Sequence, residues 1–186
     1  MKRLFDFVLA SIAGLLLLIP MLVIAALVRL TSPGPALYWS DRVGKNNVIF
    51  RMPKFRSMFT GTPAVATHLL GDANSYVTPV GHFLRKSSLD ELPQLWNILT
   101  GDMSFVGPRP ALFNQQDLIE LRTLCGVDKL SPGLTGWAQV NGRDELPIPD
   151  KVALDEEYLR KQSFFFDVRI IVMTFAKVIR RDGISH

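Results

Sequence analysis

The sequence SSLDELPQLWN, at residues 87–97, decides how we interpret the rest of the chain. It places two adjacent carboxylates, Asp90 and Glu91, at the predicted start of a helix. Apolar residues at helical spacing can bury one face of that helix and hold the carboxylates on a packed element; they are Leu89, Leu92, Leu95 and Trp96. The unpaired N–H groups at a helix N-terminus carry partial positive charge, which favours ionised carboxylates and phosphate ligands there.

Two interpretations of the acidic pair remain open at this point. Ser88 and Glu91 have the spacing of a capping box, in which case both residues would only cap the helix. Pro93 argues against a cap at Ser88, because it would then lie beyond the first turn, where its missing N–H and its ring are both costly. A helix that starts nearer Asp90 keeps Pro93 inside the first turn and leaves the carboxylates at the helix mouth.

The N-terminal part of the chain predicts a membrane segment. Residues 7–28 are almost entirely apolar, which is long enough for a helix to span a bilayer. Pro20 lies within this run, where it removes a backbone hydrogen bond and bends a helix. Basic residues flank both ends, Lys2 and Arg3 before and Arg29 after, whereas a spanning helix usually concentrates positive charge on one side. The pattern favours a re-entrant hairpin helix broken at Pro20; a kinked spanning helix is the alternative.

The composition limits the class of protein. The chain has 186 residues, 48% of them hydrophobic, and 21 Lys and Arg against 17 Asp and Glu give a formal net charge of +4. This mild basicity suits an anionic lipid surface or phosphate-bearing substrates and does not indicate nucleic acid. The single cysteine, Cys125, excludes an intramolecular disulfide and a cysteine-based zinc site. We therefore expect a membrane segment over residues 1–31 and one further domain over residues 32–186.

The second domain is predicted to be α+β, mostly helical with short strands. Strands are expected at residues 36–39, 48–50, 103–106 and 135–140. Helices are expected at residues 79–86, from about 90 onward, and at 114–125, 152–162 and 168–181. Residues 59–76 have no clear period and are interpreted as a loop that can include a short helix. Three adjacent aromatic residues, at 164–166, cannot all face one core, so we expect some of them to enter the membrane interface beside amphipathic helices.

Several basic residues are candidates for binding phosphate. Lys54 and Arg56 belong to a basic cluster behind the membrane segment, which could instead only hold anionic lipid headgroups. Arg85 closely precedes the acidic pair. Arg109 lies between two prolines, and their limited backbone freedom suits a guanidinium held ready for bidentate phosphate binding. Arg143 follows a predicted tight turn.

Taken together, several stretches resemble one family, the monotopic phosphoglycosyl transferases, also called bacterial sugar transferases. The matching pieces run in family order and cover nearly the whole chain: the proline-broken apolar N-terminus, KFRSM at 54–58, RKSSLDELPQL at 85–95, GPRP at 107–110 and GWAQVNGR at 136–143. The chain is similar to the minimal form of the family, with no extra spanning helices ahead of the catalytic domain.

The resemblance implies a specific reaction. A phosphosugar would pass from a UDP-sugar to a polyprenyl phosphate, such as undecaprenyl phosphate, with release of UMP and initiation of a membrane-bound glycan. The family's nucleophilic aspartate maps to Asp90, which would form a covalent phosphosugar-enzyme. Mg²⁺ binds through one or two carboxylates plus substrate phosphates, so Glu91, together with Asp90, is the expected metal ligand. The residues expected to offset phosphate charge are Arg85, Arg109, Arg143, Lys54 and Arg56.

The resemblance also implies a location and partners. We expect residues 32–186 to form a catalytic domain on the cytosolic face of the bacterial inner membrane, in contact with membrane lipids. A homodimer and downstream glycosyltransferases are further candidate partners, and the glycan would be an O-antigen, capsule, exopolysaccharide or glycoprotein glycan. Two other functions stay open: a membrane-anchored nucleotide-sugar hydrolase that uses the same acidic pair, and a non-catalytic scaffold for glycan assembly in which the pair only caps a helix.

Overall fold

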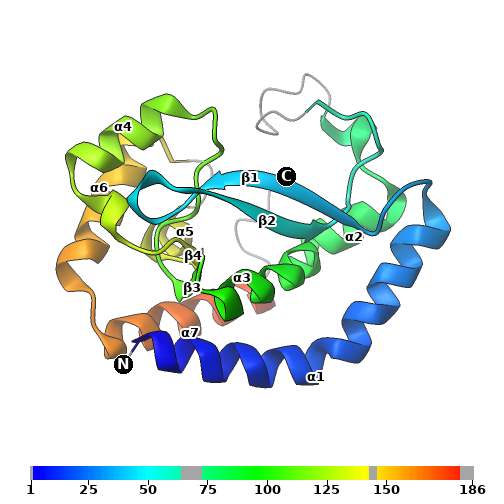
Figure 1. The fold of residues 1–186 in the computed structure, drawn as a ribbon, viewed down its shortest axis with the longest axis horizontal. Helices are drawn as coiled ribbons and strands as arrows, with labels where there is room; N and C mark the ends of the chain where they lie inside the picture. The colour runs from blue at the N-terminus through cyan, green and yellow to red at the C-terminus, as the bar shows by residue number, and fades with distance from the viewer. Residues whose placement is uncertain (1, 64–72, 143–145, 181–186) are drawn as a thin grey trace.

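The first helix, α1, occupies Lys2–Thr31 and lies along one edge of the molecule, with the other elements packed on one side of it (Figure 1). The structure is a computed structural model that describes residues 2–63, 73–142 and 146–180. The other α-helices are α2 (Pro79–Lys86), α3 (Leu95–Thr100), α4 (Gln116–Leu124), α5 (Trp137–Asn141), α6 (Ile148–Lys161) and α7 (Phe164–Arg180). The 3₁₀ helices are η1 (Lys45–Asn47), η3 (Ala73–Tyr76), η4 (Leu89–Gln94) and η5 (Val127–Lys129).

The strands form two small sheets. β1 (Leu37–Val43) and β2 (Ile49–Phe55) pair antiparallel, in a register that runs from Leu37 opposite Phe55 to Val43 opposite Ile49. β3 (Ser104–Val106) and β4 (Gly133–Thr135) pair in parallel. The predicted α+β class is therefore confirmed, and the hairpin strands are longer than the sequence pattern indicated.

One predicted strand is wrong. Residues 135–140 were expected to be extended, but β4 ends at Thr135 and α5 begins at Trp137. Trp137 and Val140, three positions apart, both pack against the cluster formed by Val106, Tyr158 and Ile170. A spacing of three places two side chains on one face of a helix, whereas in a strand they would point to opposite faces.

The membrane segment differs from the predicted hairpin. α1 is helical without interruption from Lys2 to Thr31, and Pro20 lies inside it. The ribbon bends part-way along α1 but does not fold back on itself (Figure 1). A helix of 30 residues is about 45 Å long, so α1 is long and apolar enough to cross a membrane by length and composition.

Charged side chains fix the N-terminal end of α1 to the domain. Lys2 Nζ donates to Asp167 Oδ2 in α7. Arg3 donates to carbonyl groups at the end of α3. Asp6 is buried, and its Oδ1 accepts a hydrogen bond of 3.1 Å from the backbone N–H of Phe105 in β3. A buried carboxylate needs such a partner, so these contacts hold this end of the helix in one position.

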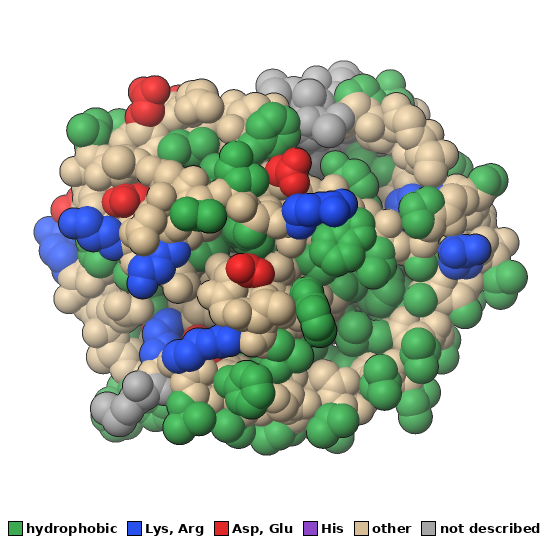
Figure 2. Space-filling view, in the orientation of Figure 1, with side chains coloured by type: hydrophobic (Ala, Val, Ile, Leu, Met, Phe, Trp, Pro, Cys, Tyr) green, Lys and Arg blue, Asp and Glu red, His purple; other side chains and the backbone are tan. Residues whose placement is uncertain are grey.

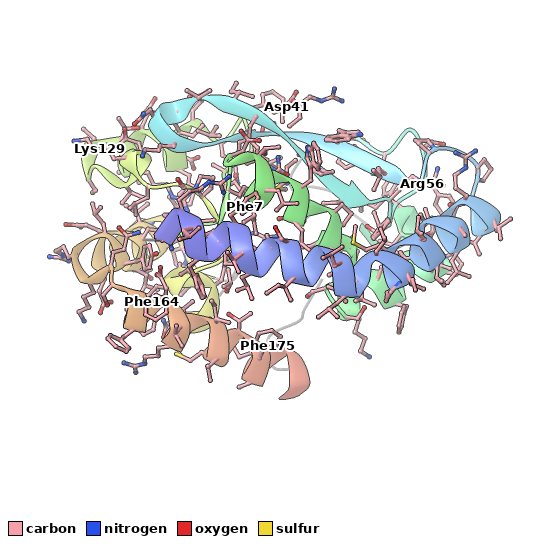
Figure 3. All side chains as sticks on the ribbon, turned by 60° about the horizontal axis from the view of Figure 1, so that its bottom comes forward. Phe7, Asp41, Arg56, Lys129, Phe164 and Phe175 are labelled. Atoms are coloured by element: carbon pink, nitrogen blue, oxygen red, sulfur yellow. The ribbon has the colours of Figure 1, made fainter. Side chains whose placement is uncertain are left out.

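The C-terminal end of α1 is fixed by Arg56, which follows β2 and lies beside the end of α1 in Figure 3. Its guanidinium is buried and donates at 2.8 Å to both the carbonyl and the Oγ of Ser32, and also to the carbonyl of Pro33. The last carbonyls of a helix lack partners and carry partial negative charge, so a cation is favoured there. Both ends of α1 are thus bound to the same domain.

Between its ends α1 packs on the domain along one stripe only. Ala10 lies in a core cluster with Met52 and Ile98, and Ile24 lies in a second cluster with Leu84. The opposite side of α1 is exposed and apolar; its most exposed large side chains are Leu15, Leu16, Ile19 and Leu30. Figure 2 shows hydrophobic side chains gathered along the edge that α1 occupies in Figure 1.

The last helix, α7, adds to this apolar surface. Phe165, Val172 and Phe175 are exposed on α7, while Ile170 is buried against the domain. Figure 3 shows α7 beside the N-terminal half of α1, with Phe164 and Phe175 at the same side of the molecule as Phe7. Exposed apolar surface of this extent is typical of a protein or membrane contact.

Candidate active site

The acidic pair lies on η4, between α2 and α3. Ser88, which precedes η4, has a left-handed backbone conformation (φ 56°), and its side chain makes no capping hydrogen bond. The capping box allowed by the sequence is therefore not formed. Leu89 and Leu92 pack against the cluster shared by α1, α2 and β2, which fixes η4 on the domain. Trp96, expected on the buried face, is 60% exposed, so that part of the prediction is wrong.

Asp90 is a buried carboxylate, only 8% exposed. Among the residues that the structure describes, none hydrogen-bonds this carboxylate. Burial raises the pKa of Asp90, and the neighbouring charge of Glu91 adds to this effect, while the positive charges of Lys54, Arg109 and Arg85 oppose it. Asp90 is therefore a poorly solvated anion with nearby cations, an arrangement that is more common at functional sites than elsewhere.

Glu91 joins two cations from distant parts of the chain. Its Oε1 accepts from Lys54 Nζ at 2.7 Å and from Arg109 Nη2 at 3.3 Å. Lys54 comes from β2, and Arg109 from the turn that follows β3. The structure thus brings together four predicted site residues, Asp90, Glu91, Lys54 and Arg109, in one place. Carboxylates flanked by basic side chains can accept a phosphate group, since the cations would pair with its oxygens.

Arg85 lies in the last turn of α2, and its charge acts on the Asp90 carboxylate. Two other predicted phosphate ligands have different outcomes. The guanidinium of Arg56 is buried against the end of α1 and bound to main-chain carbonyls, so its donors are directed away from a phosphate-binding role. Arg143 lies outside the described residues.

The turn that carries Arg109 is fixed through its backbone. Gly107 N donates to Thr135 O and Gly133 N donates to Pro108 O, each at 2.9 Å. A Cβ on Gly107 would lie 2.3 Å from the carbonyl oxygen of Ser131, so the approach of the two strands requires glycine there. The turn is therefore held rigidly beside Glu91.

One residue near the acidic pair was not singled out from the sequence. Gln94, three positions after Glu91, is buried, and its Nε2 has no hydrogen-bond partner within the described part of the chain. It lines a narrow recess together with Arg42 and Arg109. Side chains three positions apart eclipse in a 3₁₀ helix, so recognising the 3₁₀ geometry would have placed Gln94 on the same side as Glu91.

Comparison with known proteins identifies the family. A family model described as "Bacterial sugar transferase" matches residues 1–181. The chain belongs to the bacterial sugar transferase family. It is 43% identical, over 186 residues, to the UDP-glucose:undecaprenyl-phosphate glucose-1-phosphate transferase of Escherichia coli K12, an alignment that covers 95% of this chain and 40% of that protein.

Two relatives in the family have lengths closer to that of this chain. The exopolysaccharide production protein ExoY of Rhizobium meliloti is 38% identical over 199 residues, which cover 98% of this chain and 87% of that protein. The uncharacterized sugar transferase EpsL of Bacillus subtilis is 38% identical over 186 residues, covering 100% and 91%. The chain spans two fifths or less of the undecaprenyl-phosphate glucose transferases of Escherichia coli and Komagataeibacter xylinus, at 40% and 36%.

Proposed function

We propose that this protein transfers a phosphosugar from a UDP-sugar to a polyprenyl phosphate, releases UMP and so initiates a membrane-bound glycan. The observation that carries the proposal is the Asp90 carboxylate: buried, not hydrogen-bonded by any described residue, and adjacent to a Glu91 that binds two cations. The names of the relatives, which specify transfer of glucose 1-phosphate or related groups to undecaprenyl phosphate, support the same donor and acceptor classes.

The proposed reaction has two steps. An oxygen of Asp90 attacks the β-phosphorus of the UDP-sugar, a bond forms between that oxygen and phosphorus, and the bond from the β-phosphorus to the bridging oxygen breaks, so that UMP leaves. A phosphate oxygen of the polyprenyl phosphate then attacks the same phosphorus, and the bond to Asp90 breaks. The product is a polyprenyl diphosphate sugar, and the carboxylate is regenerated. A covalent intermediate divides one difficult transfer into two easier ones.

The basic residues have separate tasks in this scheme. Phosphoryl transfer depends mainly on positioning and on stabilising charge at the phosphate oxygens. Lys54 and Arg109 already lie at Glu91, so a diphosphate placed beside Asp90 comes within reach of both. Arg85 adds positive charge from α2. Burial of Asp90 weakens its solvation, which makes the ionised carboxylate more reactive at the cost of a raised pKa.

The two alternative functions have less support. A scaffold would need the acidic pair only as a cap, and Ser88 makes no capping bond. A hydrolase would have no need of a lipid acceptor, whereas the exposed apolar faces of α1 and α7 suit a lipid-borne acceptor.

The test is to measure UMP release from a panel of UDP-sugars with and without polyprenyl phosphate. We expect turnover with at least one sugar only when the lipid is present; turnover independent of the lipid would show a hydrolase.

Mg²⁺ is part of this proposal, and the residues present fit it. Within the described residues, no three His, Cys, Asp or Glu side chains are grouped so that they could hold a metal ion, so substrate phosphates would have to supply part of its coordination. Asp90 and Glu91 can supply the one or two carboxylates that Mg²⁺ typically uses alongside substrate phosphates. The ion would be held mainly by Glu91 and would neutralise charge on the diphosphate.

We predict that activity requires Mg²⁺ and that the ion binds weakly without the UDP-sugar, because the substrate provides ligands. Ca²⁺ should be a poor substitute, since its bonds are longer and its geometry looser. Turnover should be lost in excess chelator and restored by added Mg²⁺, and calorimetry should detect tighter Mg²⁺ binding in the presence of UDP-sugar. Full activity in excess chelator would contradict the prediction.

We also propose a monotopic topology, in which both ends of α1 stay on the cytosolic side of the bacterial inner membrane and the bent apolar helix enters one leaflet. Lys2 and Arg56 tie opposite ends of α1 to the same domain. A helix that crossed the hydrocarbon core, about 30 Å thick, would have to release one of these anchors. Arg29, which is exposed near the C-terminal end of α1, would then lie among anionic headgroups, a contact worth about 1 kcal/mol.

The monotopic topology predicts that the two ends of α1 lie on the same side of the membrane and are equally accessible to a reagent on that side. In a Cys125→Ser background, single cysteines replace Leu4 and Thr31, which are both exposed. An impermeant thiol reagent added outside intact cells should label neither position, and the same reagent should reach both in opened membranes. Labelling of the Leu4→Cys protein from outside would show that α1 spans the bilayer.

A further inference from the structure

The buried side chain of Arg122 holds the main chain at Arg109, the arginine that contacts Glu91. Arg122, in α4, donates from Nη1 to the carbonyl oxygen of Arg109 at 2.7 Å. Arg42, in β1, donates from Nη1 to the next carbonyl, that of Pro110, at 3.3 Å. Two consecutive carbonyls of the turn are therefore bound by guanidinium groups from two different elements, and these bonds come in addition to the backbone bonds of the turn.

Arg122 is itself held by Asp155 of α6. Its Nε and Nη2 donate to Asp155 Oδ2 at 3.0 Å and 2.6 Å. Arg122 is 8% exposed and Asp155 is 1% exposed. The guanidinium has a rigid, planar arrangement of donors, so fixing two of them on one carboxylate also fixes the direction of the third, which points at the carbonyl of Arg109.

The pair is poorly explained as a source of stability. Burial raises the pKa of Asp155 by more than the charge and hydrogen bonds of Arg122 lower it. The folded protein therefore disfavours the ionised carboxylate relative to the unfolded chain, and the cost is present at every pH above the ordinary aspartate pKa of about 3.9. Buried ion pairs in general are weak evidence for stability, because desolvation can exceed the attraction.

We propose that Asp155 and Arg122 are positioning residues that fix the Arg109 turn at the catalytic carboxylates. The inference rests on the proposed function, in which Arg109 binds substrate phosphate. Asp155 directs Arg122, Arg122 holds the carbonyl of Arg109, and the Arg109 side chain stays at Glu91 ready for the diphosphate. A small displacement of such a group is costly, since misplacement by about 1 Å can lower a rate about 100-fold.

The first measurement uses Asp155→Asn, which keeps the shape of the side chain and removes its charge. We expect kcat/KM to fall about 10- to 100-fold. The Tm should fall as well, because the substitution leaves the buried Arg122 guanidinium without its counter-charge, so the kinetics are measured well below the Tm of both proteins. A fall in kcat/KM of protein that is fully folded at the assay temperature separates positioning from a purely structural role. Wild-type kcat/KM in this variant, or a loss no larger than the fraction of protein unfolded at the assay temperature, would overturn the proposal.

The second measurement is a double-mutant cycle with Arg109→Ala. If Asp155 acts through Arg109, adding Asp155→Asn to Arg109→Ala should lower kcat/KM no further. The matched control is Glu157→Gln on the same helix, because its carboxylate binds Lys161 and Trp137 and not Arg122. Whatever the size of its own effect, this substitution should change kcat/KM by the same factor in the wild-type and the Arg109→Ala backgrounds.

The outcomes also separate this inference from the proposed function. An Arg109→Ala protein with wild-type activity would refute the phosphate-binding role of Arg109 and the inference with it. If Arg109→Ala is strongly impaired, its residual activity is measured at a high enzyme concentration, so that a further decrease can still be detected. If Arg109→Ala is impaired and Asp155→Asn lowers kcat/KM by the same factor in both backgrounds, the positioning role fails while the proposed function stands.

Discussion

Asp90→Asn should lower phosphosugar transfer by about 10³-fold or more, which is the scale of loss when a nucleophile is removed. An amide cannot form the proposed acyl phosphate, because it lacks the anionic oxygen that attacks phosphorus. Fold and membrane attachment should be kept, since η4 is fixed by Leu89 and Leu92 rather than by the carboxylate. The measurement is UMP release by purified protein with UDP-sugar and polyprenyl phosphate.

The same substitution should not destabilise the protein and should raise its Tm at neutral pH. The pKa of Asp90 is raised by burial, so the ionised form costs stability above the unfolded-state value of about 3.9. Asparagine removes that cost. For a chain of this length each 1 kcal/mol corresponds to about 2–4 °C in Tm. The difference in Tm between the two proteins should vanish as the pH falls through the two pKa values, where wild-type Asp90 is also neutral.

A matched control is available on β1. Asp41 is exposed and lies on the outer side of the hairpin, as Figure 3 shows. Asp41→Asn should leave both turnover and Tm close to those of the parent. Near wild-type turnover in Asp90→Asn would contradict the assignment of the nucleophile, whatever its stability.

Arg109→Lys should have the second largest effect, a fall in kcat/KM of about 100-fold, the scale for losing one preorganised charge-stabilising group. Lysine keeps the positive charge but lacks the planar pair of donors that binds phosphate bidentately. The turn should be unchanged, because it is held through main-chain atoms. Steady-state kinetics over a range of UDP-sugar concentrations give the value.

The control for this substitution is Arg160→Lys, on α6, where the arginine side chain is 68% exposed and its ion pair with Glu156 spans 4.0 Å. Exposed pairs of this kind contribute little, so kinetics and stability should not change. If Arg109→Lys matched the parent enzyme in kcat/KM, Arg109 would be a surface charge with no role in binding the diphosphate.

Local patterns predicted the elements that depend on neighbouring residues. Thr78 accepts from Gly81 N, and a proline begins the helix, so α2 occupies the predicted residues 79–86. The acidic pair and its attachment to a packed element follow equally from the spacing of Leu89 and Leu92. Patterns of this kind are readable because the forces that produce them act within a few residues.

The features that local patterns did not predict depend on contacts between segments that are distant in the sequence. Arg56 and Lys54 are two positions apart and look equivalent in the sequence, yet Lys54 reaches Glu91 while Arg56 binds carbonyls at the end of α1. Only the packing of α1 against β2 distinguishes them. Arg122 and Asp155 are 33 positions apart, on two predicted helices in which the sequence pattern singled out no site residue. Trp96 fits the apolar pattern but has no partner surface on its side of α3 among the described elements, so it stays exposed.

The central claim is that Asp90 becomes covalently attached to the phosphosugar, and intact-mass analysis tests it most directly. Wild-type protein is incubated with its UDP-sugar and Mg²⁺ without polyprenyl phosphate, so that the second step cannot occur. We expect a mass increase equal to one phosphosugar, absent from Asp90→Asn and removed on addition of polyprenyl phosphate. An active wild-type enzyme that never gains this mass, or an Asp90→Asn protein that gains it, would show that Asp90 is not the covalent nucleophile.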